Sequence, residues 1–126
     1  MTKEPRGFVP GRHRIETYGG GGFRFAEMSH KGSILALPSG IHAFPWESAG
    51  DIDEASLALL FAEPRGAVEL LIVGSGAELK PLPAALRARL KACGVISETM
   101  ATGAAVRTYN MLLDEDRRVA AVLIAV

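Results

Sequence analysis

The stretch of sequence that decides the fold reads Val68-Glu69-Leu70-Leu71-Ile72-Val73-Gly74-Ser75-Gly76. Its first six residues are almost continuously apolar, which is typical of a strand buried on both faces of a parallel sheet. A helix is predicted directly after the glycine turn, from Pro81-Leu82-Pro83 through Cys93, with Gly94 as the residue that ends it. The stretch therefore predicts a strand that leads through a tight turn into a helix.

The residues that follow extend this pattern to the end of the chain. Val95–Glu98 is predicted as a short strand, and Thr99–Asp116 as a helix capped by Thr99 or Thr102. The wholly apolar Val119–Val126 is predicted as a final buried strand. The order strand, helix, strand, helix, strand indicates α/β layering with right-handed crossovers.

The first half of the chain is predicted to be rich in β-structure. Two short strands flank Gly19–Gly22 and suggest a hairpin or a small second sheet. Further strands are expected at Ser33–Leu37 and Ile41–Phe44, and a helix is expected to start at Asp51 with Glu54 completing a capping box. Residues 1–11 carry prolines, glycines and charges and are predicted to be a flexible arm before a single domain at 12–126.

Composition limits the classes of function. The chain has 126 residues, enough for one domain, and its 14 basic and 14 acidic residues give a net charge of +0. This balance argues against a general nucleic-acid binder and favours self-association, since little charge repulsion opposes a homo-oligomer. A single cysteine, no secretory signal and no apolar run of ~20 residues predict a cytoplasmic protein without a membrane span.

Two polar turns are the candidate site. Gly74, Ser75 and Gly76 follow a buried strand, where ligands of α/β proteins often bind, and the helix that begins near Thr102 could hold an anion with Arg107. The predicted cleft comprises Gly74, Ser75, Gly76, Thr102, Arg107 and Asn110. The simpler alternative is a structural turn, a capping Thr102, an Arg107 that pairs with a carboxylate and an Asn110 that hydrogen-bonds a neighbouring loop.

No catalytic or cofactor set emerges from the residues. Leu79 stands where a dinucleotide loop needs its third glycine, and Val73 and Ala77 flank Ser75 where a nucleophile elbow needs glycines. The three histidines are scattered and predict no metal site. Cys93, near the negative end of its helix, is not expected to be a reactive thiolate. We expect no catalytic residue, no metal and no cofactor.

Several segments together resemble a family of small uncharacterised domains from bacteria and archaea, which includes a mitochondrial assembly factor of respiratory complex I. The resemblance runs from about Ile15 to Val126 and is most specific in Thr102–Asn110. The segments that carry it are Tyr18–Phe23, Pro45-Trp46, Leu71–Gly76, Met100–Asn110 and Arg117–Ala121. Some relatives have cysteine in place of Val106 and threonine in place of Ser75.

The resemblance implies a three-layer α/β domain with a central mixed sheet, flanking helices and an extra N-terminal β layer. It also implies no established enzymatic activity for the bacterial members. Two hypotheses remain open. The first is a non-catalytic adaptor or assembly factor that binds protein partners, such as respiratory-complex subunits. The alternative is a domain that binds a small anion or metabolite at the predicted cleft, with weak hydrolase or transferase chemistry.

Overall fold

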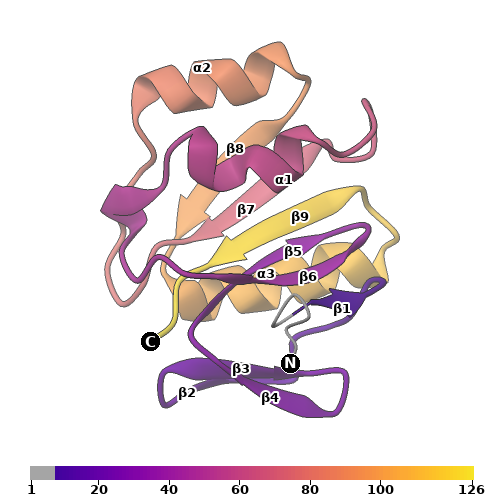
Figure 1. Ribbon diagram of the computed structural model, residues 1–126, viewed down its shortest axis with the longest axis vertical. Helices are drawn as coiled ribbons and strands as arrows, with labels where there is room; N and C mark the ends of the chain where they lie inside the picture. The colour runs from indigo at the N-terminus through magenta and orange to yellow at the C-terminus, as the bar shows by residue number, and fades with distance from the viewer. Residues whose placement is uncertain (1–7) are drawn as a thin grey trace, which may run out of the picture.

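The apolar stretch around Leu71 forms strand β7 (Leu70–Gly74) inside a six-stranded mixed sheet. The computed structural model describes residues 8–126, and Met1–Gly7 lie outside the described part. The strands of the main sheet follow the order β1-β6-β5-β9-β7-β8. They are β1 (Val9–Pro10), β5 (Ser33–Leu37), β6 (Gly40–Phe44), β7, β8 (Ile96–Met100) and β9 (Val119–Leu123). Figure 1 shows this sheet with the smaller sheet beside it.

Strand β9 joins the two halves of the main sheet. It pairs parallel with β7 and antiparallel with β5, and β7 also pairs parallel with β8. The central mixed sheet and the predicted parallel position of β7 are therefore confirmed. β9 is buried at every position, because both faces of the sheet are covered.

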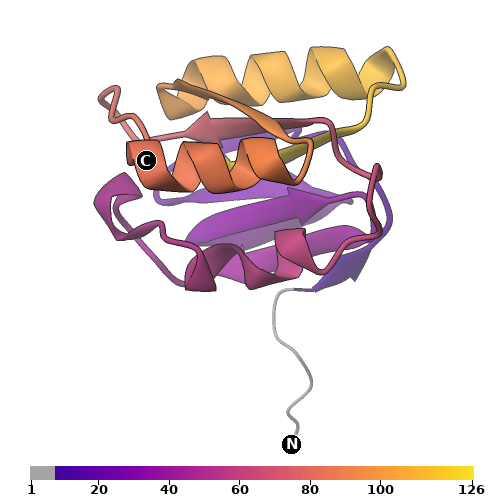
Figure 2. The same cartoon turned by 90° about the horizontal axis from the view of Figure 1, so that it is seen from above.

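Side chains that alternate along β9 enter two separate hydrophobic cores. Ala120 and Val122 belong to the core under α2 (Ala84–Ala92), together with Leu86 and Leu90. Ala121 and Leu123 belong to the core under α3 (Thr102–Asp114), together with Ala105, Val106 and Tyr109. Helix α3 and the short α1 (Ala58–Phe61) lie on opposite sides of the molecule (Figure 2). The layers are thus helix, sheet and helix.

The predicted extra β layer is a three-stranded antiparallel sheet. It consists of β2 (Thr17–Gly19), β3 (Gly22–Phe25) and β4 (Met28–Lys31), in the order β2-β3-β4. Phe23 and Phe25 of β3 are buried in the same core as α3. The glycine run forms the β2–β3 turn, and Gly20 and Gly21 adopt positive φ angles of 62° and 84° there. The sequence predicted the hairpin but not its third strand.

The predicted helix from Asp51 was wrong in its start and its cap. Ser48 caps a 3₁₀ turn at Ala49–Asp51, a second 3₁₀ turn covers Ala55–Leu57, and only α1 is α-helical. Asp53 and Ser56 make the reciprocal hydrogen bonds that were expected of Asp51 and Glu54. The Asp53 carboxylate accepts the backbone amide of Ser56, and the Ser56 hydroxyl accepts the backbone amide of Asp53, each at 2.8 Å. The Glu54 carboxylate forms an ion pair with Arg89 at 3.0 Å and so connects this segment to α2.

The other boundaries move by a few residues. Helix α2 begins after Pro83, and Gly94 follows its end with a φ of 83°, as expected of a terminating glycine. Helix α3 begins after Ala101, whose side chain makes no cap, so the predicted cap by Thr99 or Thr102 was wrong. Of the predicted arm, Val9–Pro10 is a strand paired with β6, and residues 1–7 lie outside the described part.

Candidate functional site

The two predicted polar turns meet at the carboxyl ends of β7 and β8. The Ser75 amide donates to the carbonyl of Met100 at 2.9 Å, and the Thr102 amide donates to the carbonyl of Gly76 at 2.9 Å. This is the edge where the connections of neighbouring parallel strands leave toward opposite faces, α2 on one face and α3 on the other. Such a position is where ligands bind in many open α/β sheets.

Both hydroxyls at this place are used within the fold. Ser75 Oγ donates to the carbonyl of Glu78 at 2.6 Å and accepts the amide of Lys80 at 3.0 Å. Thr102 Oγ1 donates to the carbonyl of Ile124 at 2.7 Å and accepts the amide of Gly76 at 2.9 Å. Ser75 and Thr102 are both buried. We call this set of contacts the strand-end latch, because it ties the ends of β7, β8 and β9 together.

Glycine is required at the first position of the latch. A Cβ atom on Gly74 would lie 3.0 Å from Cβ of Ala105 and 3.0 Å from Cα of Thr102. Because α3 approaches the end of β7 so closely, even a methyl group here would force its neighbours to move. The start of α3 therefore packs directly against the end of β7 at Gly74.

Arg107 and Asn110 lie on another part of α3. The Asn110 side chain accepts the amide of Ile15 and donates to the carbonyl of Ile15, each at 2.8 Å. Arg107 is exposed and lines a shallow hollow of about 360 Å³ with Asn110, Arg14, Met111, Asp114 and Glu115. Arg14 in that hollow forms an ion pair with Asp114.

Ser75 lines a different hollow. This one measures about 470 Å³ and lies between the β7 turn and the residues after β9, with Gly76, Glu78, Lys80, Ile124 and Ala125 among its lining residues. The structure thus brings Gly74, Ser75, Gly76 and Thr102 together, and it places Arg107 and Asn110 apart from them. Acidic residues line both hollows, which makes neither of them a strongly cationic site for an anion.

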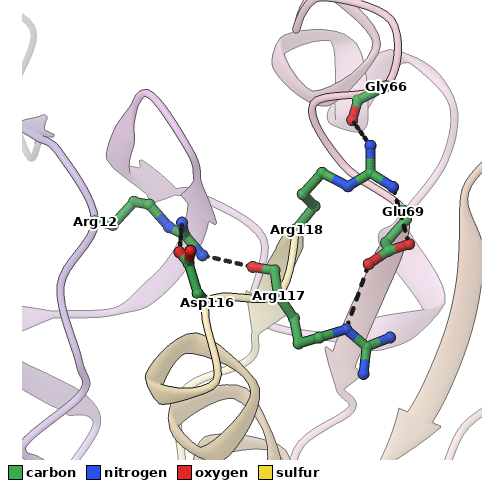
Figure 3. Close-up of polar contacts among 6 residues, drawn as sticks. All are labelled: Arg12, Gly66, Glu69, Asp116, Arg117 and Arg118. Carbon is green, nitrogen blue, oxygen red and sulfur yellow. Dashed lines mark hydrogen bonds and ion pairs between the residues drawn. The ribbon is translucent and has the colours of Figure 1, made fainter.

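A polar cluster occupies the amino-terminal ends of β7 and β9, as Figure 3 shows. Arg117 and Arg118 both contact the carboxylate of Glu69, at 3.4 Å and 3.2 Å. Arg118 also donates to the carbonyl of Gly66 at 2.9 Å. The hydrogen bond from Arg117, and then that from Arg118, hold the pKa of Glu69 below its ordinary value against the opposing effect of desolvation.

Arg12 brings the N-terminal region into this cluster. Its guanidinium donates to the carbonyl of Arg117 at 2.6 Å and lies 3.4 Å from the carboxylate of Asp116. Asp114–Arg118 is a compact run of charged residues in the sequence. Partners so far away in the chain cannot be identified from spacing. The guanidiniums of Arg117 and Arg118 share one carboxylate, so the cluster connects loops and does not resemble a catalytic set.

The histidines do not converge. His13 and His30 each contact a backbone carbonyl three residues away in sequence, and the His42 ring lies 4.6 Å from that of Phe8. Burial lowers the pKa of His42, with a smaller opposing effect from Glu63. Within residues 8–126 no three metal-ligating side chains come together. Among the same residues, no helix has the length and apolarity needed to cross a bilayer.

Solved structures of other proteins share this fold. The chain is 47% identical to a protein of Bartonella henselae whose crystal structure is described as that of an outer membrane protein. The superposition has a TM-score of 0.87 and covers 92% of this chain and 97% of that one. The mixed sheet, its helices and the additional β layer therefore belong to a fold already seen by experiment.

Two curated relatives span most of the chain. An uncharacterised protein of Rhodobacter capsulatus is 42% identical over 127 residues, which cover 98% of this chain and 93% of that protein. The zebrafish (Danio rerio) NADH dehydrogenase [ubiquinone] 1 alpha subcomplex assembly factor 3 is 34% identical over 111 residues. That match covers 87% of this chain and 63% of the assembly factor, so the longer protein has regions without a counterpart here.

A family model described as "Protein of unknown function (DUF498/DUF598)" matches residues 15–124, nearly the same range as the resemblance noted in the sequence. This family model covers most of the chain, and the Rhodobacter protein is similar over nearly the whole length of both chains. This chain therefore belongs to the DUF498/DUF598 family.

Proposed function

We propose that this protein is a non-catalytic adaptor that binds other proteins during the assembly of respiratory-complex subunits in the bacterial cytoplasm. The observation that carries the proposal is the use of the polar side chains at the predicted site. Ser75, Thr102 and Asn110 all make hydrogen bonds to backbone groups of the same chain. Groups that hold the fold together in this way are not available to bind or activate a substrate.

The relationship to an assembly factor supports the same proposal. The zebrafish relative is named for assembly of NADH dehydrogenase, and its matched region covers most of this chain. A shared fold does not by itself fix a shared role. We therefore transfer only the general class of function, the binding of protein subunits before they enter a complex.

Affinity capture from the native organism tests the adaptor role. The tagged protein is expressed at its natural level, and the soluble and membrane fractions are captured separately and identified by mass spectrometry. We expect stoichiometric recovery of subunits of a respiratory NADH dehydrogenase, mainly from the soluble fraction. Repeated capture without any stoichiometric partner would contradict the adaptor role, and recovery only with membranes would contradict the cytoplasmic location.

A deletion strain provides an independent measurement. Loss of an assembly factor is expected to lower NADH oxidation by isolated membranes while succinate oxidation, which bypasses that complex, stays unchanged. Equal loss of both activities would indicate a general growth defect instead of an assembly role.

The alternative, binding of a small anion or metabolite, has its own test. A ligand present at about 100 times its dissociation constant stabilises a protein by ~2.7 kcal/mol. Thermal unfolding in the presence of nucleotides and phosphorylated metabolites would reveal such a ligand, and Arg107→Ala should then remove the shift. If no compound changes the melting temperature, the adaptor role is the remaining proposal.

A further inference from the structure

Strand β8 forms an open edge of the main sheet. It pairs with β7 on one side and is the last strand in the sheet order, opposite the end formed by β1 (Figure 1). With five residues it is longer than β1, which has two and ends in Pro10. A proline cannot donate a backbone hydrogen bond, so it protects the β1 edge. The β8 edge has no such protection.

The backbone groups that face outward can be assigned from the contacts with β7. The Ile96 amide donates to the carbonyl of Glu69 at 3.1 Å, and the Met100 carbonyl accepts from the amide of Ser75 at 2.9 Å. Because the N–H and C=O groups of one residue point to the same side of a strand and alternate along it, those of Ser97 and Thr99 point away from β7. Among residues 8–126 these outward groups have no hydrogen-bond partner.

The side chains beside this edge are exposed on the α3 face. Ile96 has an exposed fraction of 60%, because α3 packs on β7 and β9 and reaches β8 only at the margin. Met100, on the same face of β8, is only partly buried. An added strand would cover this apolar surface and satisfy the outward backbone groups at the same time.

The charge of Glu98 determines which kind of added strand the β8 edge favours. It lies between Ile96 and Met100 on the same face of β8, is exposed, and has no ion-pair partner among the described residues. A second copy paired antiparallel about Ser97 would place Ile96 opposite Glu98 and bring the two Glu98 carboxylates close together. Like charges across strands oppose pairing, and opposite charges favour it. The edge therefore disfavours its own copy and suits a basic strand.

We propose that the open edge of β8 is the docking surface for an extended segment of a partner protein, which adds to the main sheet with a lysine or arginine facing Glu98 and apolar residues facing Ile96 and Met100. The proposal rests on the proposed function only in taking the partner to be a protein. The β8 edge is a different surface from the predicted cleft at Gly74–Gly76 and Thr102.

A synthetic peptide tests the surface without knowledge of the partner. The probe is acetyl-Thr-Val-Thr-Lys-Thr-Val-Thr-amide, whose sequence is symmetric, so that parallel and antiparallel pairing offer the same side chains. Nuclear magnetic resonance of the ¹⁵N-labelled full chain would follow the titration. We expect the chemical shifts of the Ser97 and Thr99 amides to change saturably, and the hydrogen exchange of these amides to become slower. A peptide with glutamate in place of the lysine should bind about five- to tenfold more weakly.

Three variants and a control locate the interaction. Glu98→Gln should reduce the preference for the lysine peptide to less than about twofold, since the charge pair is lost. Ser97→Pro removes one outward amide, and Ile96→Lys places a like charge beside the peptide's lysine on a side chain that is already exposed; each should abolish binding. Met111→Ala, on the exposed side of α3, should bind as the wild type does.

Several results would overturn the proposal. One is a titration to several millimolar that leaves the Ser97 and Thr99 amides unchanged, and another is equal binding of the two peptides. A third is a concentration-dependent dimer in sedimentation equilibrium that Ser97→Pro converts to monomer, because the occupant would then be a second copy. If native capture recovers a partner that Ser97→Pro and Ile96→Lys bind normally, this surface is wrong while the adaptor role stands.

Discussion

Asn110 holds Ile15 by both of its backbone polar groups, with two hydrogen bonds of 2.8 Å between residues that are 95 positions apart. The Asn110 side-chain amide thus pairs with both backbone groups of Ile15, as the backbone of a neighbouring strand would. It fastens the segment that leads into the small sheet against α3, where Ile15 is buried in the core. Of the two roles that the sequence suggested for Asn110, a ligand contact and a hydrogen bond to a neighbouring loop, the structure shows the second, and it connects the first and last thirds of the chain.

This connection predicts a loss of stability for Asn110→Leu. The substitution leaves the amide and the carbonyl of Ile15 unpaired in a partly buried place, which should lower the free energy of unfolding by about 2 kcal/mol. Urea unfolding followed by circular dichroism measures it. Met111→Ala, one residue along and 54% exposed, is the control and should change stability by less than about 0.5 kcal/mol. Equal effects of the two substitutions would contradict this role.

The strand-end latch makes a second prediction. Thr102→Val keeps the shape of the side chain but leaves the carbonyl of Ile124 and the amide of Gly76 without their partner. We expect a loss of about 3 kcal/mol in the free energy of unfolding, since Thr102, Ile124 and Gly76 are all buried and two backbone groups lose their partner. Thr99→Val in β8 changes a hydroxyl that makes no hydrogen bond within residues 8–126 and is the matched control. A loss below about 1 kcal/mol for Thr102→Val would argue against the latch.

A third prediction concerns Tyr18 and Gly103, which meet where the small sheet contacts the start of α3. The Tyr18 hydroxyl lies where a Cβ atom of residue 103 would be. In a Tyr18→Ala background, Gly103→Ala should stabilise the protein by up to about 1 kcal/mol, because alanine favours helix more than glycine does. With Tyr18 present the same change should gain less or destabilise. A double-mutant cycle gives the coupling, and a coupling of zero would mean that the two side chains do not compete.

The Glu69 cluster makes stability depend on pH. Hydrogen bonds from Arg117 and Arg118 lower the pKa of Glu69 in the folded protein, so the ionised carboxylate is favoured there over the unfolded chain. This contribution is present above the ordinary pKa of 4.5 and is lost as the pH falls from there through the lowered value.

The measurement compares wild type with Glu69→Gln in urea between neutral and acid pH. The wild type should be the more stable protein near neutrality, and the difference should shrink as the pH falls below about 4.5. Glu115→Gln, whose carboxylate has no ion-pair partner among residues 8–126, serves as the control for a general charge effect. A difference that stays constant down to strong acid would exclude the assignment to Glu69.

The features that the sequence predicted well depend on local patterns. The apolar run at Leu70–Val73, the glycine run of the hairpin and Gly94 after α2 each act through neighbours in the chain, so spacing alone identifies them. The latch was recognised only in part. Gly74 and Thr102 were both selected, but as walls of a cleft, because the sequence does not show how closely α3 approaches the end of β7.

The features that the sequence missed depend on distant partners. Glu54 was assigned to a local cap with Asp51, yet it pairs with Arg89. Asp53 and Ser56 make the reciprocal hydrogen bonds instead. Arg12 contacts the backbone of Arg117, 105 positions away. Pairings of this kind follow from the way the sheets pack, and no periodicity in a single sequence reports them.

The position of β9 has a consequence for how the protein folds as it is synthesised. The strands contributed by the first half of the chain and those contributed by the second half are neighbours only through β9, which comes last of all. A ribosome that has not yet released residues 119–123 therefore holds two sheet fragments whose edges at β5 and β7 are both unfilled. The main sheet cannot be completed until residues 119–123 have left the ribosome, and until then these edges are exposed to chaperones and to pairing with other chains.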